Sequence, residues 1–291
     1  MKQNQKGFGH LMIIVIVVLV ATVGFVGWRV LSANKTNKQI STTSPASTST
    51  QKQPDSASTI ESPQKVTTSD GKQYFYYGAP AGQNNASPKR IVIDLPGHET
   101  KAEDGYAAWL PYIKDGKYAL AALNWWDGNG STNEHYYSPA EVLAQVKPFL
   151  KAQGYGSSDL IILFGYSRGS ANTYAVEAND RVSKDPVFDG VISASGGYQS
   201  DFTLITGQSN SSASSTLYKG IYWVLACGGK DPDPNRAGCP AMENTTKPFL
   251  QQHGATVLSI LEDPNAGHGA FHLSSLNMPK QAFDLIEAKL L

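Results

Sequence analysis

A short apolar run followed by a five-residue turn motif constrains this sequence more than any other feature. Residues 160–164 read Leu-Ile-Ile-Leu-Phe, and Gly-Tyr-Ser-Arg-Gly follows directly at 165–169. Five apolar residues in a row are too few for a buried helix and are typical of a strand covered on both faces. Gly-x-Ser-x-Gly after such a strand predicts a sharp strand-to-helix turn with Ser167 at its apex.

The two glycines of this motif have a mechanical reason. The turn brings the strand and the helix so close that a side chain at Gly165 or Gly169 would collide with the adjoining backbone. The Ser167 hydroxyl would then stand clear of the backbone, as a catalytic nucleophile requires. The alternative is a strand-loop-helix junction that happens to contain a serine. The apolar strand before the motif and the helix after it favour the nucleophile.

The strand, the Gly-x-Ser-x-Gly turn and the following helix resemble the α/β-hydrolase superfamily. The resemblance covers about Val66 to Leu291. It implies the α/β class, with a doubly wound, mostly parallel sheet and helices on both faces. It also implies a catalytic triad of serine, aspartate and histidine in that chain order.

The rest of this region carries the patterns that such a sheet needs. Apolar or alternating runs predict strands over residues 72–77, 91–95, 118–124, 191–194, 221–226 and 256–261. Helices are expected over residues 138–154, 241–253 and 279–290. Ser138 and Glu141 form a capping-box pattern, with Pro139 at the first helical position. Residues 201–215 are rich in Ser, Thr and Asn and fit either a small lid or a plain surface loop.

Asp231 is the predicted acid of the triad. Residues 221–226 form a buried strand pattern, and Cys-Gly-Gly-Lys-Asp at 227–231 leaves its carboxyl end. The resemblance places the acid there, and the spacing of glycine and aspartate in the turn favours Asp231 over Asp233. The acid is required because a histidine that takes the serine proton needs an acceptor on its other ring nitrogen to fix the tautomer.

His268 is the predicted base. The chain has six histidines. Chain order or position in the predicted sheet eliminates His10, His98, His135 and His253. His268 lies between two glycines after the last strand, in a loop that would bring its imidazole over the sheet towards Ser167. His272, at the start of the closing helix, is the structural alternative.

The resemblance also implies an oxyanion hole built from two backbone N–H groups. One belongs to Arg168, directly after the serine. The other comes from the loop after the third strand, where Pro96-Gly97-His98 follows residues 91–95. Proline stands where histidine is usual, so Gly97 and His98 both remain candidate donors.

Trp125 and Trp126 are the predicted substrate-pocket residues. They follow the fourth predicted strand and so lie at the carboxyl edge of the sheet, where ligands bind in open α/β folds. We expect one to line the pocket and the other to belong to the core. Residues 127–138 superficially resemble a calcium loop, but Thr132 occupies its glycine position and Ser138 its glutamate position. No metal site and no cofactor are predicted.

The first part of the chain is set apart by composition. Residues 11–28 carry no charged side chain and are rich in Ile, Val and Leu. At about 1.5 Å per residue such a helix comes close to the ~30 Å thickness of the bilayer hydrocarbon. This predicts a tail at residues 1–10 and a transmembrane anchor at 11–31. A cleaved signal peptide is the alternative, although the run exceeds a typical signal-peptide core.

Residues 32–68 are dominated by Ser, Thr, Pro, Gln, Asn and Lys, with almost no large apolar side chain. Such a segment buries too little surface to offset the entropy of ordering it, which predicts a flexible linker. The catalytic domain is then expected at 69–291. A linker between an anchor and an enzyme suits a single-pass protein of the cell membrane with an extracytoplasmic domain. A tethered cytoplasmic domain is the alternative.

The only two cysteines, Cys227 and Cys239, flank a segment of Gly, Asp, Pro and Asn that has little to bury. In an oxidising compartment such a pair is expected to form a disulfide. The bridge would restrain the loop that carries Asp231. Two buried free thiols are the alternative.

Charge and motifs together define the predicted function. The chain has 24 basic and 24 acidic residues and no formal net charge, which gives no basis for binding nucleic acid. We predict a serine hydrolase that cleaves a small or polymeric carboxylic ester through an acyl-enzyme. It looks most similar to the polyester depolymerase and feruloyl-esterase branch of the superfamily. A serine peptidase of the same fold and a non-catalytic binding module are the alternatives.

Overall fold

A computed structural model describes residues 61–83, 87–200, 203–205, 208–210 and 213–291. The chain divides into two units, Met1–Pro54 and Asp55–Leu291, and every described residue belongs to the second. The predicted tail and anchor and most of the predicted linker lie outside the described residues, as do parts of the predicted lid at 201–215. Among the residues described, no helix has the length and apolar content to cross a bilayer.

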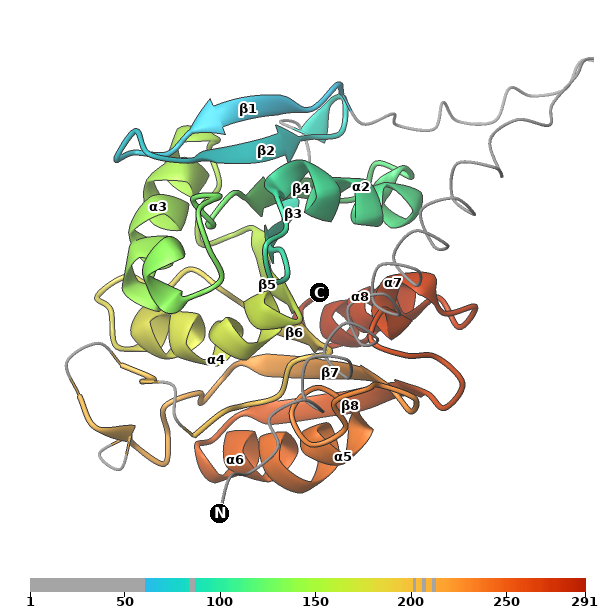
Figure 1. Ribbon diagram of the computed structural model, residues 1–291. Coiled ribbons are helices and arrows are strands. Elements are labelled where there is room, and N and C mark those ends of the chain that lie inside the picture. The colour runs from blue at the N-terminus through green and yellow to red at the C-terminus, as the bar shows by residue number, and fades with distance from the viewer. Residues whose placement is uncertain (1–60, 84–86, 201–202, 206–207, 211–212) are drawn as a thin grey trace, which may run out of the picture. The chain divides into compact units, whose positions relative to one another are not determined.

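An eight-stranded sheet runs through the described domain (Figure 1). Its strands are β1 (Gln64–Thr67), β2 (Tyr74–Gly78), β3 (Arg90–Leu95), β4 (Ala119–Leu123), β5 (Leu160–Tyr166), β6 (Gly190–Ala194), β7 (Tyr222–Gly228) and β8 (Thr256–Asp263). The spatial order is β1-β2-β4-β3-β5-β6-β7-β8. Only β2 runs antiparallel to its neighbours, and all pairs from β4 to β8 are parallel. The mostly parallel sheet is as predicted.

Helices cover both faces of this sheet. They are α2 (Ala102–Ile113), η2 (Asn133–His135), α3 (Pro139–Ala152), α4 (Arg168–Arg181), α5 (Cys239–Ala241), the π-helical turn η4 (Met242–Thr246), α6 (Lys247–Gln252), α7 (Ala270–Leu273) and α8 (Met278–Leu290). One core cluster joins α3, α4 and α6 to one face, and a second joins α2, α7 and α8 to the other (Figure 1). The fold is therefore doubly wound.

The folded part begins earlier than the predicted boundary at residue 69. Strand β1 lies inside the range assigned to the linker and pairs antiparallel with β2, with Val66 opposite Phe75. Val66 packs against the core while its strand neighbours stay mostly exposed. One apolar residue per edge strand is too weak a pattern to distinguish from a polar linker.

The capping box predicted for α3 is present. The Ser138 hydroxyl accepts the N–H of Glu141 at 3.3 Å, and the Glu141 carboxylate accepts the N–H of Ser138 at 2.8 Å. These bonds satisfy two donors at the start of the helix, where no intrahelical acceptor exists. The helix packs on α4, which begins directly at Ser167.

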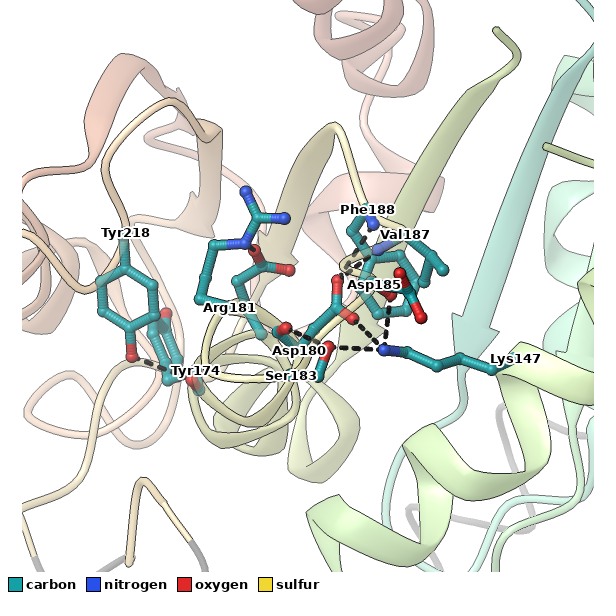
Figure 2. A network of polar contacts seen from close by, with 10 residues as sticks. Lys147, Tyr174, Asp180, Arg181, Ser183, Asp185, Val187, Phe188 and Tyr218 are labelled. Carbon is teal, nitrogen blue, oxygen red and sulfur yellow. Dashed lines mark hydrogen bonds and ion pairs between the residues drawn. The ribbon is translucent and has the colours of Figure 1, made fainter. Parts of the chain in front are cut away.

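A buried carboxylate ties α3 to the end of α4 (Figure 2). The Asp180 side chain is fully buried, and its Oδ2 accepts the N–H groups of Val187 at 2.8 Å and Phe188 at 3.1 Å. Its Oδ1 lies 3.1 Å from Nζ of Lys147 on α3. Lys147 also donates to the Ser183 hydroxyl at 2.6 Å. These bonds fix the turn through which the chain leaves α4 and enters β6.

Replacing Asp180 by alanine is expected to lower the free energy of unfolding by about 3 kcal/mol. The substitution leaves two buried N–H groups without an acceptor and removes the partner of Lys147. Chemical denaturation with and without the substitution measures the effect. Asp284→Ala is the control, because the Asp284–Lys280 pair is exposed and its loss should leave the midpoint unchanged. Equal midpoints for Asp180→Ala and the control would contradict the assignment.

Candidate active site

Ser167 occupies a backbone conformation that few residues other than glycine adopt. It stands between β5 and α4 with φ 54° and ψ −114°. A Cβ placed at Gly169 would lie 1.9 Å from the carbonyl oxygen of Leu95, and one at Gly165 would lie 2.5 Å from the backbone of Gly169. The turn therefore tolerates no side chain at either glycine, which is the reason expected from the sequence. The strained φ at Ser167 is maintained by this packing.

The three residues predicted as the triad lie in one line of hydrogen bonds. The Ser167 hydroxyl lies 2.8 Å from Nε2 of His268, and Nδ1 of His268 lies 2.8 Å from Oδ2 of Asp231. With the proton on Nδ1, the imidazole donates to the carboxylate and Nε2 accepts from the serine. The three side chains come from the ends of β5, β7 and β8, far apart in sequence and adjacent at the carboxyl edge of the sheet.

The acid is buried and firmly held. The Asp231 side chain is 0% exposed, and its Oδ1 accepts the N–H of Asp233 at 3.0 Å. Asp233, the alternative acid, is exposed and serves the site through this backbone donor. A Cβ at Gly228 would lie 2.1 Å from the carbonyl oxygen of Gly267, so the glycine lets the acid loop and the histidine loop touch. Lys230 donates its N–H to the carbonyl of Ala266 at 2.9 Å across the same junction.

Ser195 positions the histidine, a role that the sequence reading did not find. It follows β6 with φ 53°, and its buried hydroxyl donates to the carbonyl oxygen of His268 at 2.6 Å. Its own N–H donates to the carbonyl of Ala226 on β7 at 2.9 Å. A serine at a strand end is a weak signal in sequence, because the bond depends on which loop folds over it.

His272, the alternative base, lies elsewhere. It sits on α7, and its ring packs 5.2 Å from Trp109 and 5.5 Å from Phe164, measured between centroids. Burial lowers the pKa of this imidazole to about 4. The structure thus places His268 at the serine and His272 among aromatic side chains.

Gly97 lies beside the nucleophile. A Cβ added to Gly97 would lie 3.4 Å from Cβ of Ser167 and 3.0 Å from the Tyr166 ring. His98 is exposed, and its ring stacks against that of Tyr136 with centroids 6.3 Å apart. The N–H of Arg168 belongs to the first residue of α4, where helical N–H groups have no intrahelical acceptor. The loop after β3 and the start of α4 therefore flank Ser167, as the predicted oxyanion hole requires.

A hollow of about 360 Å³ opens onto Ser167 and His268. It shares Asn133 and Arg168 with a neighbouring hollow of about 280 Å³. The Arg168 guanidinium lies 4.0 Å from the Tyr136 ring centroid and donates to the side chain of Asn133. The two hollows therefore meet at a fixed cationic side chain.

The two tryptophans predicted for the pocket take different places. Trp125 is 1% exposed, lines the 280 Å³ hollow and donates its indole N–H to the carbonyl of Pro96 at 3.0 Å. Trp126 is half-buried and donates its indole N–H to the carbonyl of Gly130 at 2.7 Å. It packs against the core and is not among the residues that line the hollow at Ser167. One tryptophan therefore reaches a hollow and holds the loop that contains Gly97.

Cys227 and Cys239 form a disulfide, which confirms the predicted pairing. The bridge connects β7 to the start of α5 and closes the loop that contains Asp231. Across the described ranges, no group of three or more His, Cys, Asp or Glu side chains is arranged to hold a metal ion.

Comparison with solved structures places this domain in the α/β-hydrolase fold. A Thermus thermophilus protein superposes with a TM-score of 0.56 at 16% identity, covering 79% of this chain and 97% of its own. The Bacillus cereus carboxylesterase gives 0.51 at 16% identity, with coverage of 76% and 96%. Brefeldin A esterase, a bacterial homologue of human hormone-sensitive lipase, gives 0.52 at 16% identity, with coverage of 83% and 79%. No family model and no curated protein sequence matches the chain.

Asp231→Asn is expected to lower the rate of any Ser167-dependent reaction by about 10³- to 10⁴-fold, because an amide cannot hold the histidine in the right tautomer. Asp233→Asn is the matched control, since its backbone N–H remains and its side chain is exposed. Steady-state kinetics of both variants decide the assignment. Equal losses, or a larger loss in Asp233→Asn, would contradict it.

Removing the disulfide is expected to cost stability and rate together. Replacing both Cys227 and Cys239 by alanine releases a loop closed across a separation of 12 residues, for which chain entropy predicts about 3 kcal/mol. Thermal unfolding and turnover number measure the two effects. Intact mass after alkylation of the protein, isolated without reductant, tests the bridge itself. Two alkylated thiols in that sample would refute it.

Proposed function

We propose that this α/β-hydrolase-fold domain is a serine hydrolase that cleaves a carboxylic ester through an acyl-enzyme. The observation that carries the proposal is the continuous hydrogen-bonded line from Ser167 through His268 to the buried Asp231. A surface serine has no structural need for a histidine at 2.8 Å that is itself held by a buried carboxylate. The same arrangement is what nucleophilic catalysis by a hydroxyl requires.

The geometry assigns each residue a step. Ser167 Oγ attacks the ester carbonyl while Nε2 of His268 takes its proton, and Asp231 stabilises the imidazolium that forms. The tetrahedral intermediate collapses as Nε2 returns the proton to the departing alcohol. A water molecule then gives a proton to Nε2 as it attacks the acyl-enzyme. Nε2 passes that proton to Ser167 Oγ as the acid leaves, which restores the free serine and the neutral imidazole.

The oxyanion of each intermediate would bind between the N–H of Arg168 and the loop at Gly97. Backbone donors fixed before the reaction stabilise such charge at no cost in reorganisation. The strained turn at Ser167 serves this purpose, because it points the hydroxyl out of α4 while leaving the first N–H groups of that helix free to bind an anion. A Cβ at Gly97 would lie 3.0 Å from the Tyr166 ring, so the glycine lets this loop approach without displacing that ring.

The hollow at Ser167 suits a polar ester. Arg168, Arg236 and Asp233 line it together with Asn133 and Gln199. Two guanidinium groups and one carboxylate among the lining residues favour an acyl or alcohol group with hydroxyl or carboxylate substituents over a bare hydrocarbon chain. The carboxylesterase and brefeldin A esterase among the similar structures support ester chemistry. A peptide amide would be the substrate under the alternative reading as a peptidase.

We further propose that the domain is extracytoplasmic and held at the cell membrane by residues 11–31. The uncharged run at 11–28 supports the anchor. The disulfide supports an oxidising compartment, since such bonds are rare in the cytosol. Anchor and linker together would let the enzyme reach substrates near the cell surface.

Ser167→Ala is expected to abolish labelling by a fluorophosphonate probe and to lower ester hydrolysis by at least about 10⁴-fold. Alanine removes the nucleophile and little packing, so thermal unfolding should stay unchanged. Ser195→Ala is the informative comparison. It should retain labelling at a reduced rate, because it loosens His268 without removing the nucleophile.

A panel of p-nitrophenyl esters beside peptide p-nitroanilides separates the two enzyme readings. Turnover of esters with no turnover of amides supports the proposal, and the reverse supports a peptidase. If wild-type protein gives neither labelling nor hydrolysis, the reading as a binding module replaces both. Labelling that persists in Ser167→Ala would overturn the assignment of the nucleophile.

A further inference from the structure

Asp94 is a buried carboxyl group that the proposed reaction does not use. It lies near the end of β3, between Ala122 on β4 and Phe164 on β5. It is 1% exposed, and neither carboxylate oxygen has a hydrogen-bond partner among the described residues. A buried acid of this kind is costly to retain, because burial without a partner forfeits several kcal/mol of hydration. An unpartnered buried acid therefore calls for a ligand.

Asp94 lines a cavity of about 220 Å³ that lies behind the nucleophile turn. The other walls include Gly105 and Ala108 of α2, Phe164 and Tyr166 of β5, and His272 and Leu273 of α7. Nε2 of His272 is also buried and has no hydrogen-bond partner within the described part of the chain. Two unpartnered buried polar groups on different elements thus line one space whose other walls are mostly apolar.

Both polar groups are acceptors for a cation. A carboxylate accepts hydrogen bonds, and burial lowers the pKa of His272 to about 4, so its imidazole is neutral and offers a lone pair. The described residues that line the cavity include no Lys and no Arg, and Asp104 adds a second carboxylate at an exposed position. The titratable side chains on the elements around Asp94 are Arg90, Glu103, Asp104, Tyr106, Tyr112, Tyr166 and His272.

The aromatic walls also favour a positive ligand. The rings of Phe164 and Tyr166 line the cavity, and aromatic rings attract cations through their quadrupoles. Leu273 and Ala108 offer apolar contact to the remainder of a ligand. In other proteins a cavity of about 150 Å³ holds benzene. A space of about 220 Å³ therefore has room for one aromatic ring with a short polar chain.

We propose that this cavity is a binding site for a small primary ammonium ion with an aromatic or short aliphatic body. Its ammonium group donates hydrogen bonds to Asp94 and to Nε2 of His272, and its body packs against Phe164 and Leu273. No residue lines both this cavity and the hollow at Ser167. The two sites are nevertheless adjacent. Gly97, in the loop beside Ser167, lines the cavity, and so does Gly269, which directly follows His268.

Binding of an ammonium ion at this site should depend on pH and should release a proton. Burial raises the pKa of the Asp94 carboxyl to about 8, so the unoccupied protein holds a proton there at neutral pH. An ammonium ion binds the ionised form and expels that proton. The dissociation constant should therefore fall about tenfold between about pH 6 and pH 7 and level off above pH 8. At pH 7, binding should release about 0.9 proton per ligand.

Calorimetric titration of the full-length protein with benzylammonium tests the proposal. We expect saturable binding with a dissociation constant at or below about 1 mM. Titrations in buffers of different ionisation enthalpy measure the proton release. Benzyl alcohol, which has the same shape without the charge, is expected to bind at least about tenfold more weakly and to release no proton.

Asp94→Asn is the decisive variant, because asparagine has the shape of the protonated carboxyl and should preserve the fold. It is expected to weaken benzylammonium binding at least about tenfold and to abolish the pH dependence. Asp284→Asn, at an exposed carboxylate outside the cavity, is the matched control and should change affinity less than about threefold. Ser167→Ala should bind benzylammonium normally, which separates this site from the proposed catalysis.

Three results would overturn the proposal. The first is no saturable binding of benzylammonium by the wild-type protein. The second is equal binding of benzyl alcohol, which would make the cavity a purely apolar site. The third is wild-type binding without proton release, which would show that Asp94 is not the acceptor; this measurement stands even if Asp94→Asn fails to fold.

Discussion

The close approach of β5 and α4 at Ser167 is the constraint on which the rest of the site depends. Gly169 lies so near the carbonyl of Leu95 that no side chain fits between them. That contact brings the end of β3, and with it the loop at Gly97, against the nucleophile. Gly196 allows the end of β6 to approach in the same way, since a Cβ there would lie 2.2 Å from the carbonyl oxygen of Ser167. Close backbone packing thus places the loop at Gly97 and the ends of β3 and β6 around Ser167 before any side chain contributes.

The loops that carry the acid and the histidine are positioned by each other. Lys230 binds the carbonyl of Ala266, and Ser195 binds the carbonyl of His268. The disulfide fixes the far end of the acid loop. Each bond restrains backbone and not the reacting atoms, so the imidazole keeps its freedom to pass a proton while its location is set. Supporting contacts of this kind decide whether the side chains of a serine, a histidine and an aspartate are held at hydrogen-bonding distance from one another.

Most strands and most candidate site residues could be predicted from the sequence, because each was indicated by a short local pattern. Apolar runs located β3 to β8 within a few residues. Chain order and position left His268 and His272 among six histidines, and the glycines on either side of His268 favoured it. The sequence did not predict α2, whose Gly105 and Pro111 read as helix breakers. Gly105 is required there by contact with Asp94, since a Cβ would lie 2.5 Å from its Oδ2. The sequence could not predict that Ser195 positions His268, because that hydrogen bond forms only when the ends of distant strands meet in the fold.

Two aspartate and histidine pairs lie close to the nucleophile turn, and their surroundings give them opposite properties. Asp231 accepts bonds from Asp233 and His268 on its two oxygens, so its charge is shared among donors that are present in the folded chain. Asp94 lies in an apolar setting with no such donor, and there the neutral carboxyl is the stable form. A carboxylate that is already satisfied can orient a base through a catalytic cycle. A buried carboxyl without such donors stays neutral at neutral pH, and a bound cation would favour its ionised form, so the same residue type is then suited to recognition.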